Sequence, residues 1–367
     1  MKTRLAVIAL TLTFGLSCSN SSNPVVNSSA PRTYSGTASV GDFLSITLDP
    51  STLTISYKNL SNGDTGSAIP YVVNIDGTYT LQDPQANLVA AYEVPGFGLL
   101  VEAAKAGPQH NSPALVTAVA KGSGISTTSW ANQSFNYMQF RTAAGGLEVG
   151  SVVMDAQGDV THESYWPYGS ASGGLPFNAG QFLSSFFVPD PSGAFMTMTN
   201  GGETDYVFGT PNGVFAVDTP NGAIIGLKKA STKAFNPAAA GTYKAIYYQK
   251  TGATTGLGNV ETGIPSLANA TIIVGSTGQI TVQDKTGATI VQTALTPVAD
   301  APYLYGSAGE LTDPCFGLFT FRIASATKQQ DVFVTFVDHA ILFASFTEVL
   351  PASGSNPYDY LYGVGLK

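Results

Sequence analysis

One four-residue turn, which occurs twice, constrains this chain more than any other feature. Thr-Pro-Asn-Gly stands at residues 210–213 and again at 219–222, between short runs rich in Val, Phe, Ile and Tyr. Proline fixes φ at about −65°, and asparagine and glycine accept the positive φ that a tight hairpin requires. Residues 205–229 are therefore predicted to form three consecutive antiparallel strands, a β-meander. Positive φ is expected at Gly213 and Gly222, so valine at either should cost about 1–3 kcal/mol.

The remainder of the chain resembles looser versions of this meander. Of its 367 residues, 44% are hydrophobic and only 11% are charged, and there are 40 glycines. That composition excludes a disordered chain and is typical of many short strands joined by tight turns. Pro84 allows a short helix over 85–91 as an alternative to a strand there. Beyond the meander, strands are predicted at residues 43–48, 53–57, 69–74, 77–82, 88–94, 97–103, 114–120, 137–141, 148–154, 160–165, 181–188, 194–199, 241–248, 271–274, 280–283, 317–323, 332–337, 341–346 and 360–366.

These strands fall into three series, residues 33–128, 129–235 and 236–367, each about 100 residues long, a common domain size. Each series holds about eight strands, enough for a small antiparallel barrel or sandwich. The fold class is therefore predicted as all-β, with tandem antiparallel β-meander units and no long helix. A β-propeller is the alternative, because about 24 strands also make six blades of four. The runs 332–337 and 341–346 are apolar on both faces, which indicates strands buried on two sides or packed against another unit.

The N-terminus has the three parts of an export signal. Lys2 and Arg4 give a basic start, residues 5–16 are apolar, and a small residue precedes Cys18. The apolar run is too short to span a membrane well. Residues 1–17 are therefore predicted to be a signal peptide, and their removal lowers the net charge of −8 by two more. Because the chain has no basic cluster, nucleic-acid binding and adsorption to anionic lipid are not expected.

Residues 15–18, Gly-Leu-Ser-Cys, resemble the cleavage box of bacterial lipoproteins. In that family the cysteine is diacylated on sulfur and becomes the mature N-terminus. The resemblance implies that Cys18 is lipidated and attaches the protein to a membrane, and residues 18–32 have the polar composition of a flexible tether. Ser19 would then favour the outer membrane over the inner one. The expected location is the bacterial cell envelope, as an outer-membrane lipoprotein or as a periplasmic or extracellular protein.

The chain carries no recognisable catalytic or metal-binding motif. Cys315 lies among apolar neighbours and is expected to be a buried core residue without a disulfide, since Cys18 belongs to the export signal. His110, His162 and His339 lack partners at metal-ligand spacing and are expected at surface or hairpin positions. No nucleophile elbow, phosphate loop or dinucleotide motif is present. We therefore expect no catalytic residue, no metal and no cofactor.

Aromatic side chains give the better indication of a ligand site. Tyr165, Trp166 and Tyr168 stand where a predicted strand meets a loop rich in Gly and Ser. Exposed rings at such a position can stack on a sugar or hold an apolar molecule, and the alternative is that they close a barrel end. Three more tyrosines occupy alternate positions of residues 358–362, which places them on one face of the last strand. Packing in the core is the expected use of that second stripe.

Three functions remain open from the sequence. The first is a non-catalytic ligand-binding module, with an apolar barrel interior or the aromatic loop as its site and a glycan or apolar small molecule as its ligand. The second is a surface structural or adhesion protein that uses strand edges or loops. The third is a carbohydrate-active enzyme, since paired carboxylates meet in space and not in sequence. The ligand-binding module is the prediction carried forward.

Overall fold

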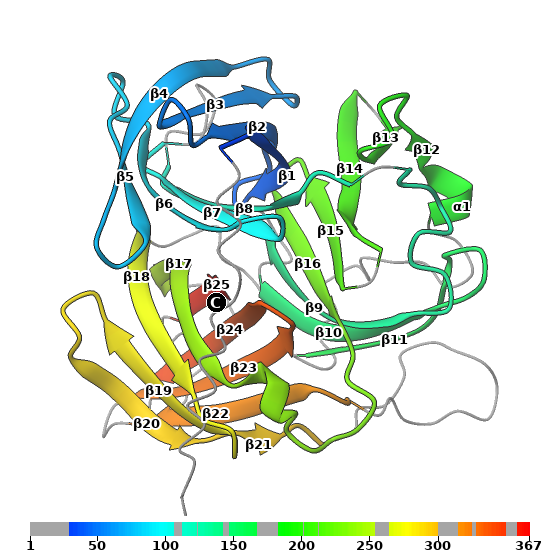
Figure 1. Cartoon of the computed structure of the whole chain (residues 1–367). Helices are drawn as coiled ribbons and strands as arrows, with labels where there is room; N and C mark the ends of the chain where they lie inside the picture. Colours follow the sequence, from blue (N-terminus) through cyan, green and yellow to red (C-terminus); the bar gives the residue numbers. More distant parts are fainter. Residues whose placement is uncertain are drawn as a thin grey trace, which may run out of the picture.

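The computed structural model shows an all-β molecule made of three curled antiparallel sheets that follow one another along the chain (Figure 1). Among the described residues, the helical elements are α1 (Leu183–Phe186) and the short 3-10 turn η1 (Pro237–Ala239). No helix in this part of the chain is long and apolar enough to cross a membrane. The predicted tandem meander units are confirmed, and the propeller alternative is wrong. The structure describes residues 29–105, 112–122, 124–141, 147–166, 183–200, 202–211, 213–253, 264–299, 315–324, 328–349 and 358–367.

The first sheet is a closed barrel of eight strands in sequence order, called here the first barrel. Each strand pairs with the next, and β1 also pairs with β8, where Tyr34 lies opposite Ala120. Closure leaves no free sheet edge among these eight strands. The strands are β1 (Arg32–Ala38), β2 (Phe43–Asp49), β3 (Thr54–Asn59), β4 (Thr65–Val73), β5 (Thr78–Leu81), β6 (Leu88–Val94), β7 (Gly98–Ala103) and β8 (Ala114–Ala120).

The second sheet is curled but open, with the order β11-β10-β9-β16-β15-β14-β13-β12. Its first and last strands in chain order, β9 and β16, meet near the centre, because β9 pairs with both β10 and β16. The strands are β9 (Ser134–Arg141), β10 (Leu147–Met154), β11 (Val160–Trp166), β12 (Val188–Pro189), β13 (Met196–Asn200), β14 (Glu203–Thr210), β15 (Val214–Thr219) and β16 (Gly222–Lys228).

The third sheet has nine strands in the order β20-β19-β18-β17-β25-β24-β23-β22-β21. The last strand of the chain, β25, lies between β17 and β24 and so joins the two ends of this section. The edge strands β20 and β21 do not pair with each other in the described part of the chain, which leaves a seam. The strands are β17 (Gly241–Ala253), β18 (Ile264–Val274), β19 (Gln279–Asp284), β20 (Thr289–Ala294), β21 (Thr296–Pro297), β22 (Leu318–Ala324), β23 (Lys328–Val337), β24 (Ala340–Val349) and β25 (Tyr358–Leu366).

The meander predicted at residues 205–229 is confirmed as β14, β15 and β16, but the expected backbone of its two glycines is wrong. Neither Gly213 nor Gly222 has a positive φ. Thr219 pairs with Gly222, so the second loop consists of two residues and the glycine stands at the fourth turn position. That position of a type I turn needs no positive φ.

Several strands differ from the sequence prediction. The strand β1 was not expected, because its sequence, Arg-Thr-Tyr-Ser-Gly-Thr-Ala, lacks an apolar alternation and is held in the sheet by neighbours on both sides. The strands β20 and β21 were also missed. In the predicted strand 181–188, the described part contains α1, whose Ser184 backbone and hydroxyl both bond to the Asp159 carboxylate. The alternative helix over 85–91 is absent, because Asp83 accepts three backbone N–H groups of a turn that leads directly into β6.

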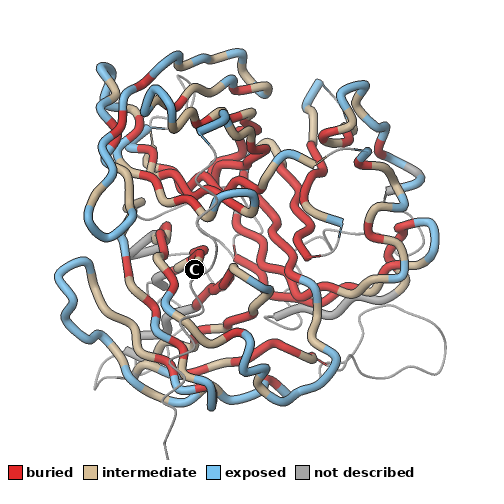
Figure 2. Tube along the Cα trace, in the orientation of Figure 1, coloured by how far each residue is buried: buried red, intermediate tan, exposed pale blue. Residues whose placement is uncertain are grey.

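Strands that are apolar on both faces are explained by a core that all three sheets share. On β24, Ile341 and Phe343 point into the third sheet, whereas Leu342 and Ala344 pack in a central cluster. The first barrel and the second sheet contribute side chains to the same cluster, and Phe43 of the first barrel stacks on Tyr206 with ring centroids 4.3 Å apart. Figure 2 shows this buried zone where the sheets meet. The predicted contact of these strands with another unit is therefore confirmed.

Aromatic rings lying over glycines allow the sheets to curl tightly. Tyr137 pairs with Gly150 across β9 and β10, and a Cβ atom on Gly150 would lie 2.4 Å from the Tyr137 ring. Phe343 and Gly363 repeat this arrangement across β24 and β25, again at 2.4 Å. A glycine opposite a large ring lets the ring lie flat against the neighbouring strand. Curvature in this fold therefore depends on where glycines face aromatic residues.

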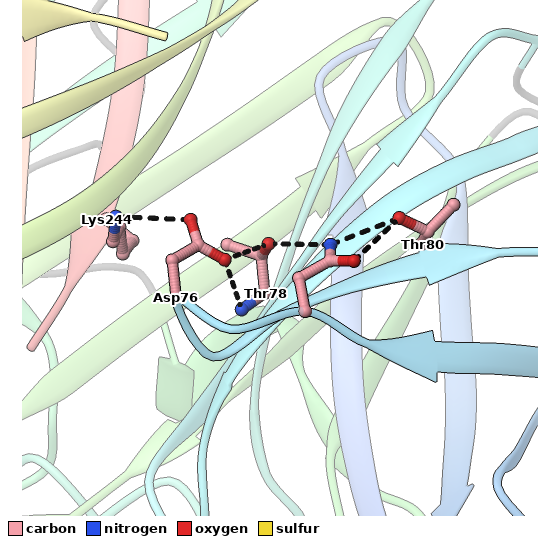
Figure 3. A network of polar contacts seen from close by, with 5 residues as sticks. Asp76, Thr78, Thr80 and Lys244 are labelled. Carbon is pink, nitrogen blue, oxygen red and sulfur yellow. Dashed lines mark hydrogen bonds and ion pairs between the residues drawn. The ribbon is translucent and has the colours of Figure 1, made fainter. Parts of the chain in front are cut away.

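Polar contacts tie the first barrel to the third sheet at the molecular surface (Figure 3). Asp76, at the tip between β4 and β5, lies 3.3 Å from the Lys244 ammonium of β17. The same carboxylate accepts a hydrogen bond of 2.6 Å from the Thr78 hydroxyl, which stiffens the tip. Both members of the ion pair are partly exposed, and such pairs contribute about 1 kcal/mol or less. The shared apolar core is therefore the main source of cohesion between the sheets.

Candidate functional site

The interior of the third sheet contains the candidate site, a cavity of about 380 Å³. This volume lies in the range of small-molecule pockets, roughly 300–1,000 Å³. None of the described residues that line it carries a charge. The lining residues are Tyr247, Gln249, Ala270, Ile272, Ile280, Val282, Ile290, Val291, Phe321, Ile323, Gln330, Val332, Val334, Ile341, Phe343, Tyr360 and Leu361.

Strand periodicity explains the apolar wall. Alternate residues of a strand face the same side, so Val332 and Val334 of β23 point inward together with Ile341 and Phe343 of the adjacent β24. Ile290 on the edge strand β20 lines the cavity and yet is 50% exposed. The cavity wall therefore reaches the solvent at the seam beside β20.

A cluster of aromatic rings fills the sheet interior at one end. Phe336 lies at its centre, with ring centroids 5.8 Å from Phe235, 6.2 Å from Phe319 and 6.2 Å from Tyr243. The Lys367 ammonium lies 5.1 Å from the centroid of the Tyr243 ring, a cation–π distance. Burial raises the pKa of the Tyr243 hydroxyl, so this ring remains neutral at ordinary pH. The aromatic cluster closes this end of the interior.

Polar side chains gather at the opposite end. Gln249 of β17 pairs with Leu361 of β25, which in turn pairs with Ser345 of β24, so these three positions form one row across adjacent strands. The Gln330 amide donates a hydrogen bond of 2.6 Å to the Ser345 hydroxyl. Two carboxamide side chains, Gln249 and Gln330, therefore line the cavity at this end.

Two glycines of β25 help to keep the space open. A Cβ atom on Gly363 would lie 2.4 Å from the Phe343 ring and 2.7 Å from the Tyr247 Cβ. A Cβ atom on Gly365 would lie 2.7 Å from the Ile341 methyl carbon. Because β25 presents no side chain at these two positions, the neighbouring side chains lie against the wall. Larger residues here would push them toward the middle of the cavity.

The first barrel, in contrast, holds a polar cluster in its interior. The Glu93 side chain has no exposed surface, and its oxygens lie 2.6 Å from both Nε and Nη2 of Arg32. The hydroxyls of Tyr34 and Tyr79 also donate to this carboxylate. Burial raises the pKa of both tyrosines, and the Glu93 charge adds to the effect. The cluster satisfies its own hydrogen bonds, which indicates a structural role.

A larger groove of about 790 Å³ lies beside the aromatic cluster, near the connection that enters the third sheet, and Phe235, Phe319 and Phe336 are among its lining residues. Lys228, Lys229, His339 and Lys367 line it, with Asp338 as an acidic neighbour. The Lys367 ammonium donates to the carbonyls of Ala238 and Ala240 at 2.7 and 2.9 Å. Because Lys367 holds the η1 segment in place, this groove is a weaker candidate than the apolar cavity of the third sheet.

The residues predicted as a site from the sequence are not part of this cavity as described. Tyr165 and Trp166 lie on β11, where their backbones pair with Gly150 and Val149 of the second sheet. Tyr168 and the lipidation residue Cys18 lie outside the described residues. The ligand-binding role of the three aromatic residues and the lipidation of Cys18 therefore stay predictions.

Several other residues singled out from the sequence are placed by the structure. Cys315 is buried and forms no disulfide, as expected. His339 stands in the two-residue turn between β23 and β24, His162 lies on β11, and His110 is outside the described residues. Tyr360 and Tyr362 are buried in the central cluster, which confirms the core role predicted for these two members of the tail stripe. No group of three or more His, Cys, Asp or Glu side chains in the described ranges is arranged to hold a metal.

The sequence predicts an apolar barrel interior as one possible site, but it does not single out the third sheet or its glutamines. A signal was present in the last strand, where Gly363 and Gly365 stand at the alternate positions that face the interior. Gln330, one residue before a charged position and an apolar run, gave no comparable signal. A polar residue on a strand can be assigned to a binding site only when its neighbours across the sheet are known.

Comparisons with known proteins do not assign the chain to a family. No family model matches it, and no curated protein matches its sequence. A double mutant of transferrin binding protein B from Haemophilus parasuis Hp5 is 8% identical, with 92% of this chain and 76% of that chain covered and a TM-score of 0.27. Isotype 1 transferrin binding protein B from serogroup B Neisseria meningitidis is 11% identical, with coverages of 92% and 77% and a TM-score of 0.23. Kievitone hydratase from Nectria haematococca is 10% identical, with coverages of 92% and 89% and a TM-score of 0.20. Likenesses this distant support no conclusion about the ligand or partner of this chain.

Proposed function

We propose that this protein is a non-catalytic binding module that holds a small apolar molecule inside the third sheet. The observation that carries the proposal is the cavity of about 380 Å³, whose lining is apolar except for a few uncharged polar groups. Specific ligand pockets combine an apolar wall with a small number of placed polar groups in this way. Interiors of small barrels are otherwise filled by side chains, as the Glu93 cluster and its apolar neighbours fill the first barrel.

The proposal extends to the place where the module acts. Export, lipidation at Cys18 and attachment to the bacterial envelope are supported by the signal-like residues 1–17 and the lipoprotein-like cleavage box. Attachment through a lipid chain would leave the third sheet free to exchange its ligand with the surroundings. Intact mass measurement of the protein recovered from membranes tests this part, because diacylation at Cys18 adds mass to a chain that begins there. A mature chain without added lipid would refute the anchor.

Filling the cavity from within tests the binding site. Val282→Phe places a ring among the lining residues of β19, and it should abolish the fluorescence enhancement of phenylnaphthylamine, an apolar probe, while the protein stays folded. Ile273→Phe is the matched control, because Ile273 is 38% exposed and its neighbours Ile272 and Val274 are the buried, inward-facing residues. The control should bind the probe as the unaltered protein does. Equal binding by both variants, or no binding by the unaltered protein, would refute the proposed site.

A further inference from the structure

Resting on the proposed function, we infer that the ligand of the third sheet is uncharged and carries one hydrogen-bonding head group, such as an alcohol, an amide or an ester. The head group lies between Gln249 and Gln330, and the apolar body of the ligand extends toward the aromatic cluster around Phe336. The inference concerns which apolar molecules the cavity accepts and in which orientation.

The two glutamines have hydrogen-bonding capacity to spare. Gln330 uses one N–H in its 2.6 Å bond to Ser345, and no described residue bonds to its Oε1 atom. The Gln249 amide has no hydrogen-bond partner among the described residues. Each carboxamide offers both a donor and an acceptor. A ligand hydroxyl, amide or ester carbonyl can therefore bond to the amide atoms that no described residue occupies.

The row of positions across the sheet places both amides at one end. Gln249, Leu361 and Ser345 lie side by side on β17, β25 and β24, so the row spans about 10 Å, or two strand spacings. Gln330 reaches this row through its bond to Ser345. The opposite end is closed by aromatic rings, and no comparable polar side chain among the described residues lines the cavity there. A ligand with a single polar end therefore has one favourable orientation.

The absence of charge from the described lining decides between head groups. A carboxylate or ammonium moved into this cavity would lose its hydration, and no lining residue could pair with it. Uncharged carboxamides can compensate the desolvation of a hydroxyl or an amide far better than that of an ion. We therefore expect a long-chain alcohol or amide to bind, and the carboxylate of the same chain length to bind poorly.

Displacement of phenylnaphthylamine by three ligands that share a ten-carbon chain tests the inference. Decanol and decanamide should displace the probe from the unaltered protein at pH 8, and decanoate should be weaker by about tenfold or more. The difference in affinity between decanol and decanoate should become smaller as the pH is lowered toward 5, because the carboxylate becomes protonated. Gln249→Met and Gln330→Met should each lower the affinity for decanol by about three- to tenfold, which is the effect of losing one hydrogen bond. Gln283→Met, on the same sheet but outside the cavity lining, should leave decanol binding unchanged.

The outcomes separate the inference from the proposed function. If the probe does not bind, or Val282→Phe binds it normally, the proposed site itself is wrong. If the probe binds in the cavity but decanoate at pH 8 competes as well as decanol, only the inference about charge is overturned. If both methionine variants keep the full affinity for decanol while their thermal unfolding is unchanged, the glutamines do not hold the head group and the inference fails.

Discussion

The first barrel and the third sheet each contain an arginine–carboxylate pair with two contacts, in different surroundings. Arg32 meets Glu93 with distances of 2.6 Å from both Nε and Nη2, and Arg322 meets Asp331 with 2.6 and 2.9 Å. The side chains of the first pair are 18% and 0% exposed, and those of the second are 56% and 37% exposed. Because the two pairs have the same chemistry but different exposure, comparing them tests how much burial of an ion pair contributes to the free energy of unfolding.

Glu93→Gln should lower the free energy of unfolding by about 3–5 kcal/mol, because it removes the charge of a fully buried carboxylate that two nitrogens of Arg32 contact. The carboxylate also accepts from Tyr34 and Tyr79, and an amide presents one acceptor oxygen and one donor NH₂ to these donors. Asp331→Asn should cost about 1 kcal/mol or less, as exposed pairs do. The predicted difference is therefore at least about 2 kcal/mol for nearly identical contact distances.

Urea unfolding followed by circular dichroism provides the measurement, at pH 7 in low salt and in about 1 M salt, where exposed pairs are screened. The small effect of Asp331→Asn should disappear in high salt, and the effect of Glu93→Gln should largely persist. The double variant Arg32→Met, Glu93→Leu should recover much of the loss, since it removes both buried charges. If Glu93→Gln costs no more than Asp331→Asn, burial does not set the contribution of this pair and the reasoning is refuted.

Two further predictions concern the second sheet. Asp218 is buried, its Oδ1 accepts from Thr37, and its Oδ2 has no partner among the described residues; burial raises its pKa well above the usual range despite that bond. The folded chain thus holds a proton that the unfolded chain loses near about pH 4, so stability should be full below that pH and fall by about 1.4 kcal/mol per unit as the pH rises toward the folded pKa. Asp218→Asn should remove this decline and raise the melting temperature at pH 8, and an unchanged pH profile would contradict it. Gly209 has a φ of 143°, and a Cβ atom there would lie 2.2 Å from the Val214 carbonyl oxygen. Gly209→Ala should therefore lower the free energy of unfolding by about 1–3 kcal/mol or more, whereas Gly222→Ala should lower it by less. Equal shifts in melting temperature for the two variants would show that Gly209 carries no backbone strain.

Local sequence signals predicted most of the strands because they act over a few residues. The turns predicted from proline and asparagine at 210–213 and 219–222 lie where β14 and β15 end. The predicted strands 88–94 and 114–120 match β6 and β8. The same local reasoning failed at Gly213 and Gly222, since the φ of a turn glycine depends on its turn position, which cross-strand pairing sets. It also missed β1, whose polar sequence is held by pairing with β2 and β8.

The candidate site was predictable only in kind. An apolar barrel interior followed from alternating strands, but the alternate glycines at 363 and 365 point to the third sheet only once the rings that they face on other strands are known. The aromatic residues chosen from the sequence, Tyr165, Trp166 and Tyr168, were selected because rings at a strand end are a local signal. Gln249 and Gln330 stand 81 positions apart in the sequence. They line the same cavity only because β17 pairs with β25 and β25 pairs with β24 in the folded sheet.

The sequence by itself determined that this chain forms short antiparallel strands in three successive series, since turn residues and two-residue alternation are properties of neighbouring positions. The tertiary structure decided which face of each strand lies inside a sheet and which lies in the core that all three sheets share. It also decided that inward-facing side chains fill the first barrel but leave a space in the third sheet. That outcome depends on sheet curvature and on Gly363 and Gly365 meeting rings from other strands, which are relations between positions distant in the chain.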